Sequence, residues 1–298
     1  MSHAVTADLA SRAALADPLE LVGLPLLMRQ TAGSSGVRIG LIDGPVARDH
    51  PALAGSRIEL LPTGTTPSAA GTALAHGTFM AGILCARRGS AAPGLCPDCT
   101  LLTRPIFSGK TATPSATMED MAAAIHDCVA AGARILNLSA AIVGPSSGRE
   151  RVLESVLNAA MAKGVLIVAA SGNQGSIGGT AITRHPWVIP VTACDRRGRP
   201  LPYANLGHSI SRRGLIAPGE GITSLTPAGA TTVAGGTSVA AALVSGTIAL
   251  LWSTFPAASG AKVRLALDRA HPRRGLVPPL LNAGAAWRAL AALMGGSA

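Results

Sequence analysis

The chain has 298 residues, of which 48% are hydrophobic and 13% are charged, and its formal net charge at pH 7 is +10. It is long enough for one large α/β domain with a substantial core. Aromatic residues make up only 2% of the chain, so small aliphatic side chains must fill that core. No apolar run approaches the length of a membrane span, which excludes an integral membrane protein, and we expect a soluble one.

The first 36 residues are expected to form a helical N-terminal extension and connector, followed by one domain over residues 37–298. Apolar spacing from Thr6 to Leu21 predicts a short surface helix, and a connector follows through Gly36. Residues 1–20 have neither the basic start nor the apolar run of a secretory signal. We therefore expect a cytoplasmic protein.

Strands and helices alternate through the rest of the chain. Apolar runs predict buried strands at 37–42, 134–139, 165–170 and 187–191. Helical spacing is found at 116–131, 149–163, 258–270 and 282–294. This alternation predicts an α/β fold in which a mostly parallel sheet lies between two layers of helices.

The five cysteines favour a reducing compartment, because their number is odd and no secretory signal precedes them. Cys96 and Cys99 form a C-x-x-C pair, but Cys85, Cys128 and Cys194 do not supply the second pair that a zinc site needs. The pair is expected to be structural, with reduced and disulfide-linked states both open. The 15 acidic residues are not grouped, so we predict no calcium or other metal site, and no cofactor.

Four polar side chains occupy positions suited to chemistry on a carbonyl group. Asp43 follows the strand 37–42, and His76 begins a segment in which a glycine turn opens a helix of small residues. Asn173 lies in a glycine-flanked loop after a later strand. Ser238 follows Gly-Gly-Thr at the start of a long run of small apolar residues.

These residue types fit the parts of a nucleophilic mechanism. Ser238 at a helix N-terminus is placed as a nucleophile, because free N–H groups and the helix dipole favour the negative charge that develops. A serine nucleophile needs a histidine to take its proton and an acid to orient that histidine. His76 and Asp43 fit these roles, and the Asn173 amide could reach an oxyanion. His50 is a weaker candidate for the base, because no glycine-opened helix follows it.

The order Asp43, His76, Asn173 and Ser238, each in its own motif, resembles that of the subtilisin-like serine proteases. The resemblance runs from about Val37 to the C-terminal helix. It implies a subtilisin-like fold and hydrolysis of peptide bonds through an acyl-enzyme. It also implies Ser238 as nucleophile, His76 as general base and then acid, Asp43 as the orienter and Asn173 as the oxyanion donor.

The resemblance extends to the substrate-binding strand. The segment 135–139 is similar to the family strand whose backbone pairs with the substrate, which implies substrate binding by Leu138, Ser139, Ala140 and Gly172. Two departures from the family pattern follow from the sequence. Ala140 and Ala141 stand where many members have glycines, and the pair 242–243, Ala-Leu, stands where members usually have Pro-His.

Short motifs at 22–31, 43–46 and 96–107 resemble the intracellular branch that matures ribosomally made peptides, including the cyanobactin leader proteases. This implies cleavage of a precursor (leader) peptide. Two alternatives stay open: a general intracellular degradative protease, and a catalytically silent peptide-binding scaffold. We expect the N-terminal helix to pack as an extension, with a substrate-docking or self-inhibiting arm as the alternative.

Part of the positive charge lies in arginine-rich turns at 196–199, 212–213 and 273–274. These turns are scattered and carry neither interleaved aromatic residues nor a nucleic-acid-binding motif, so no nucleic-acid partner is expected. A sharper hypothesis is that they steer an acidic leader peptide into the cleft. The expected partner is therefore a peptide or protein substrate, with neither nucleic acid nor membrane.

Overall fold

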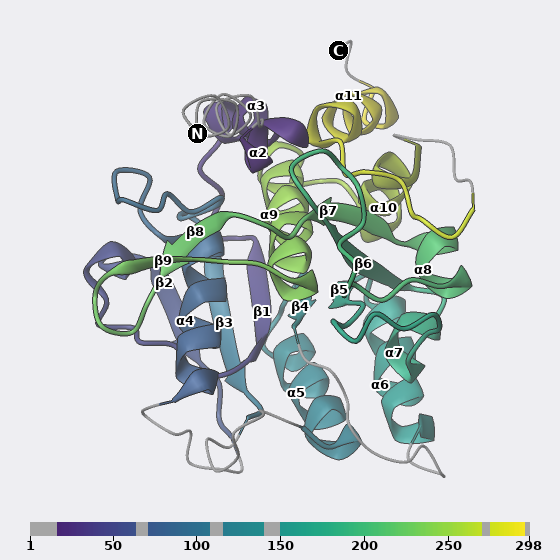
Figure 1. Ribbon diagram of the computed structural model, residues 1–298, viewed down its shortest axis with the longest axis horizontal. Helices are drawn as coiled ribbons and strands as arrows, with labels where there is room; N and C mark the ends of the chain where they lie inside the picture. The colour runs from purple at the N-terminus through teal and green to yellow at the C-terminus, as the bar shows by residue number, and fades with distance from the viewer. Residues whose placement is uncertain (1–16, 64–70, 108–115, 140–149, 270–274, 296–298) are drawn as a thin grey trace, which may run out of the picture.

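The computed structural model describes residues 17–63, 71–107, 116–139, 150–269 and 275–295. Its centre is a seven-stranded sheet, in which every pair of neighbouring strands is parallel, in the order β2-β3-β1-β4-β5-β6-β7 (Figure 1). The strands are β1 Arg38–Asp43, β2 Arg57–Leu60, β3 Thr100–Pro105, β4 Ile135–Leu138, β5 Leu166–Ala170, β6 Val188–Cys194 and β7 Leu215–Pro218. The predicted parallel sheet is confirmed.

Helices cover both faces of this sheet (Figure 1). The helices α4 (Thr72–Cys85) and α9 (Thr237–Thr254) pack on one face, and α5 (Met118–Ala130) and α6 (Glu150–Ala162) pack on the other. Successive strand residues point to opposite faces, so Leu41 joins the first core and Ile42 joins the second. This is the three-layer α/β arrangement that the sequence predicts.

The helix α9 is the central helix of the first core. Its 18 residues are apolar enough to cross a membrane by length and composition, but 83% of that stretch is buried inside the fold. The expectation that no apolar run reaches this length is therefore wrong for α9. A helix that is surrounded by protein on all sides must be apolar all round, which gives it the composition of a membrane span.

The N-terminal extension contains more helix than the sequence predicts. Asp17 caps the short helix α2 (Pro18–Leu21) through its side chain, and a second helix, α3 (Leu24–Gln30), lies in the expected connector. Leu24 and Leu27 of α3 are buried, because α3 packs against α9 and α11 (Ala283–Leu293). The part of the predicted helix before Asp17 lies outside the described residues, and the division at residue 36 stays a prediction.

The remaining elements complete the edges of the fold. A hairpin of β8 (Ile222–Leu225) and β9 (Thr231–Ala234), which the sequence did not predict, precedes α9. The short elements are η1 Pro51–Leu53, α7 Ala181–Arg184 and α8 His208–Arg213, and α10 Gly260–Arg269 lies before α11. All five cysteines are buried and free, so the C-x-x-C pair is reduced in this structure.

Candidate active site

The first half of the site joins β1 to α4. Asp43 is the last residue of β1 and its side chain is fully buried. Its Oδ1 atom accepts hydrogen bonds from the backbone N–H of Gly44 and from Nδ1 of His76, both at 2.6 Å. Since a carboxylate can only accept, this geometry puts the imidazole proton on Nδ1 and leaves Nε2 as the basic atom.

The position of His76 within its helix differs from the prediction. The helix α4 begins at Thr72, after Gly71, so His76 is its fifth residue rather than its start. Gly77 therefore lies inside the helix and does not open it. A Cβ atom at Gly77 would overlap the carbonyl oxygens of Gly44 and Pro45, so only glycine lets α4 lie this close to the turn after β1.

The Asp43 carboxylate has the largest influence on the pKa of His76. The nearby carboxylate raises the pKa of His76 above its ordinary value, burial opposes this, and the hydrogen bond to Asp43 raises the pKa further. The imidazole side chain is 37% exposed, so a substrate can reach it. One ring nitrogen of His76 is therefore held by Asp43, and the side chain as a whole stays partly exposed.

The second half of the site lies where α9 begins. Ser238 is the second residue of α9, after Gly236 at the N-cap with φ of +118°. Its hydroxyl is largely buried and donates to the backbone carbonyl of Ser139, with an Oγ–O distance of 3.1 Å. The structure describes both Ser238 and His76, and in it the Ser238 hydroxyl is bonded to the Ser139 carbonyl and not to His76.

Asn173 is held beside the same helix end. Its Oδ1 atom accepts from the backbone N–H of Thr237 at 3.0 Å, and the Gly172 N–H donates to the Thr237 hydroxyl at 3.2 Å. The amide nitrogen of Asn173 is thus directed away from Thr237 and lies close to Gly236. Asn173 is exposed, which leaves its N–H groups available to a ligand. The sequence pointed to Asn173 but not to Thr237.

The predicted substrate strand ends next to Ser238. Leu138 and Ser139 are buried, and the Ser139 hydroxyl accepts a hydrogen bond from Nδ2 of Asn137 at 2.7 Å. Oδ1 of Asn137 in turn accepts from Ser245 of α9 at 2.8 Å. This buried polar chain fixes β4 against α9. Ala140 lies outside the described residues.

His50 has a structural role. It is buried, its Nδ1 atom accepts from the Ala52 N–H at 3.0 Å, and its Nε2 atom lies 3.4 Å from the Ala230 carbonyl. Among the residues that the structure describes, no group of three or more His, Cys, Asp or Glu side chains could hold a metal ion.

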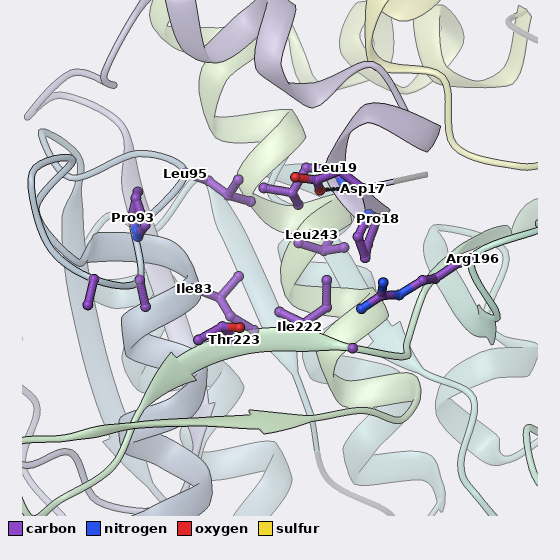
Figure 2. A pocket seen from close by; sticks show the side chains of 13 residues that line it. Asp17, Pro18, Leu19, Ile83, Pro93, Leu95, Arg196, Ile222, Thr223 and Leu243 are labelled. Atoms are coloured by element: carbon purple, nitrogen blue, oxygen red, sulfur yellow. Dashed lines mark hydrogen bonds between the residues drawn. The ribbon is translucent and has the colours of Figure 1, made fainter. Parts of the chain in front are cut away.

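A hollow of about 510 Å³ lies between α2, α4, α9 and β8 (Figure 2). Figure 2 shows Leu19, Ile83 and Leu243 around it, with the Arg196 side chain reaching in from one side. Neither the Asp43–His76 pair nor Ser238 and Asn173 are among its described lining residues. The hollow is therefore separate from these four side chains.

The parallel sheet brings the carboxyl ends of β1, β4 and β5 to one edge, where an Asp–His pair, a helix-opening serine and an exposed asparagine are placed. That fold and that set of side chains define the class of subtilisin-like proteins. The chain belongs to the subtilase family, whose profile matches residues 34–282.

Individual relatives agree with this assignment. The patellamide maturation protease PatA is 33% identical, with a TM-score of 0.75, over 89% of this chain and 99% of that one. The prenylagaramide maturation protease PagA is 29% identical, with a TM-score of 0.80, over 90% and 98%. Subtilisin NAT from Bacillus subtilis subsp. natto is 28% identical over 250 residues, which are 82% of this chain but only 62% of that protein's length.

Proposed function

We propose that this protein is a serine endopeptidase in which Asp43, His76 and Ser238 form the catalytic triad and Asn173 donates to the oxyanion. The observation that carries the proposal is the 2.6 Å contact between Asp43 and His76 at the same sheet edge as Ser238. Nε2 of His76 takes the proton of Ser238 as its oxygen attacks the peptide carbonyl. The same proton then passes to the leaving amine. In the second step His76 takes a proton from water, which attacks the acyl-enzyme, and returns it to Ser238 as the ester bond breaks.

The oxyanion of the tetrahedral intermediate would lie between the Asn173 amide and the Ser238 backbone N–H. The Thr237 N–H holds Oδ1 of Asn173, so the amide donors are oriented before the substrate arrives. Donors that are oriented in advance stabilise the transition state without a cost of reorganisation at the moment of reaction. Leu138, Ser139, Ala140 and Gly172 are proposed to border the bound peptide.

The proposed substrate is a precursor peptide from which a leader is removed. The names of two similar solved structures, both maturation proteases, support this proposal. An acidic leader fits the charge of the chain. Arg199 is paired with Asp195, whereas the side chains of Arg196 and Arg197 in the same turn make no hydrogen bond or ion pair with the described residues.

The catalytic proposal is tested by labelling with a fluorophosphonate, which reacts only with an activated serine. We expect the intact mass of the wild type to rise by one adduct, and the Ser238→Ala variant to stay unlabelled. Folded wild type without an adduct would contradict the proposal. It would favour the silent scaffold, in which the Ser238 hydroxyl stays on the Ser139 carbonyl.

The substrate proposal is tested with two peptides that share one cleavage segment, one with an acidic leader and one with glutamine in place of each acidic leader residue. We expect the acidic peptide to be cleaved faster at low salt and the difference to shrink as salt screens the charges. Equal cleavage at every salt concentration would favour a general degradative protease.

We also propose a cytoplasmic location, without membrane or nucleic-acid partners. The support is the set of five free, buried cysteines, which suits a reducing compartment. Cell fractionation of the expressed full chain tests this location, and recovery in the membrane fraction would contradict it.

A further inference from the structure

Asn205 lies in the turn before α8, far from the proposed catalytic residues in sequence, and only 8% of it is exposed. Its side chain nevertheless contacts the loop that carries Asn173. Nδ2 of Asn205 donates to the Ser171 carbonyl at 3.0 Å and to Oε1 of Gln174 at 2.8 Å. Oδ1 accepts from the backbone N–H groups of Gln174 and Ser176, both at 3.0 Å.

All the hydrogen-bonding capacity of this amide is used. A primary amide offers two donors and two acceptor positions, and Asn205 directs all four to the segment 171–176. The backbone of Asn205 adds to this, because its N–H donates to the Gly172 carbonyl at 2.9 Å. The two segments therefore form one hydrogen-bonded unit on both sides of Asn173.

The loop 171–176 lies in close contact with Asn205. Gly172 has φ of +102°, a conformation that side chains rarely adopt, and a Cβ atom there would meet Nδ2 of Asn205 and Oε1 of Gln174 at 2.5 Å. Gly172 thus permits the close contact between the loop and Asn205. Within the described part of the chain, Asn173 itself is joined to α9 by one hydrogen bond, from the Thr237 N–H.

We propose that Asn205 is a positioning residue that sets the geometry of the oxyanion donor Asn173 by bracing the loop 171–176. The inference rests on the proposed function, because it assigns Asn173 that role. Asn205 itself does not touch the reacting atoms. Its loss should lower kcat more than it changes KM, because the oxyanion develops only in the transition state.

The test is a double-mutant cycle of Asn205→Ala with Asn173→Ala. The probe is the peptide p-nitroanilide with an apolar P1 residue that wild type cleaves fastest. In the otherwise wild-type enzyme, Asn205→Ala should lower kcat by about 10²-fold, the cost of a small misplacement of a catalytic group. In the Asn173→Ala background the same change should lower kcat less than about twofold, because no positioned donor remains.

The matched control is Thr192→Val. The Thr192 hydroxyl donates to the backbone carbonyl of Asn205 at 3.0 Å, so this variant disturbs the same residue without touching its side-chain amide. We expect kcat of Thr192→Val to stay within about twofold of wild type. If Asn205→Ala does not fold, Asn205→Asp replaces it in the cycle, because the carboxylate keeps the two acceptor bonds and loses the two donor bonds.

Two outcomes overturn the inference. One is an equal fall in kcat in both backgrounds, which would mean that Asn205 acts on the fold and not through Asn173. The other is an unchanged kcat with only a lower melting temperature. Failure of the proposed function has a different signature, since wild type would then neither cleave the probe nor react with a fluorophosphonate.

Discussion

The two halves of the site are each stabilised by a different kind of interaction. Asp43 and His76 are joined by a hydrogen bond between a buried carboxylate and a titratable ring, and the negative charge of Asp43 raises the pKa of His76. Asn173 and Ser238 are instead held by neutral hydrogen bonds to Thr237 and to the Ser139 carbonyl.

Because of this difference, substitutions in the two halves should have different effects on catalysis. A defect in the Asp43–His76 half should change both the rate and its dependence on pH, because the charge of the base is altered. A defect in the Ser238–Asn173 half should change the rate alone, because no group in it titrates near neutral pH. The following variants test that distinction.

The largest loss is expected for Ser238→Ala. Removing the nucleophile should lower kcat by about 10⁶-fold, a magnitude measured on subtilisin itself. Ser245→Ala is a control on the same helix, where the lost group is the hydroxyl that donates to Asn137 at 2.8 Å. It should cost about 1–3 kcal/mol of stability by thermal unfolding, because a buried acceptor loses its partner. Comparable kcat losses in the two variants would contradict the assignment of Ser238 as the nucleophile.

Asp43→Asn should lower kcat by about 10⁴-fold, the loss known for the equivalent change in another serine protease. The amide can donate to Nδ1 and so favours the wrong imidazole tautomer. The folded variant should still bind peptide, so KM provides the internal control.

The same variant has a signature in the pH profile. His76 acts as a base only when it is neutral, so activity is lost as the pH falls through the pKa of His76. In wild type the Asp43 charge raises that pKa, which moves the acid limb of kcat/KM upward. Asp43→Asn removes the charge, so the acid limb should move to lower pH. An unmoved limb would show that Asp43 does not set the basicity of His76.

Asn173→Ala should lower kcat by about 10²–10³-fold, again a magnitude from subtilisin. The pH profile should keep the shape of the wild type, because the lost group is uncharged. A shifted acid limb would contradict the separation of the two halves, since it would couple Asn173 to the titration of His76.

Local patterns, taken together with their order along the chain, predict the four proposed catalytic residues. Asp43 ends an apolar strand, Asn173 follows Gly172 after another strand, and Ser238 follows Gly-Gly-Thr at the start of a helix, so each lies in a short motif of its own. The alternation of strands and helices likewise predicted the layers of the fold. These features depend on neighbours along the chain.

Contacts between distant segments could not be predicted in this way. Asn205 has its partners about 30 residues earlier in the chain, and nothing in its local turn sequence indicates them. The helix α3 is too short to form alone and depends on packing against α9 and α11. The start of α4 was misplaced because Gly77 was interpreted as a helix opening, whereas it permits a close backbone approach.

The smallest effect is expected for Thr237→Val, which preserves the shape of a fully buried side chain and removes its hydroxyl. That hydroxyl accepts from the Gly172 N–H at 3.2 Å, while the Thr237 N–H still holds Asn173. Loss of one such bond is worth about 1 kcal/mol, or about fivefold in kcat. Thr237→Ser keeps the hydroxyl and should retain nearly all the activity. Because the change leaves His76 untouched, the pH profile should not move. Equal rates for the two variants would mean that the Thr237 backbone alone positions the loop 171–176.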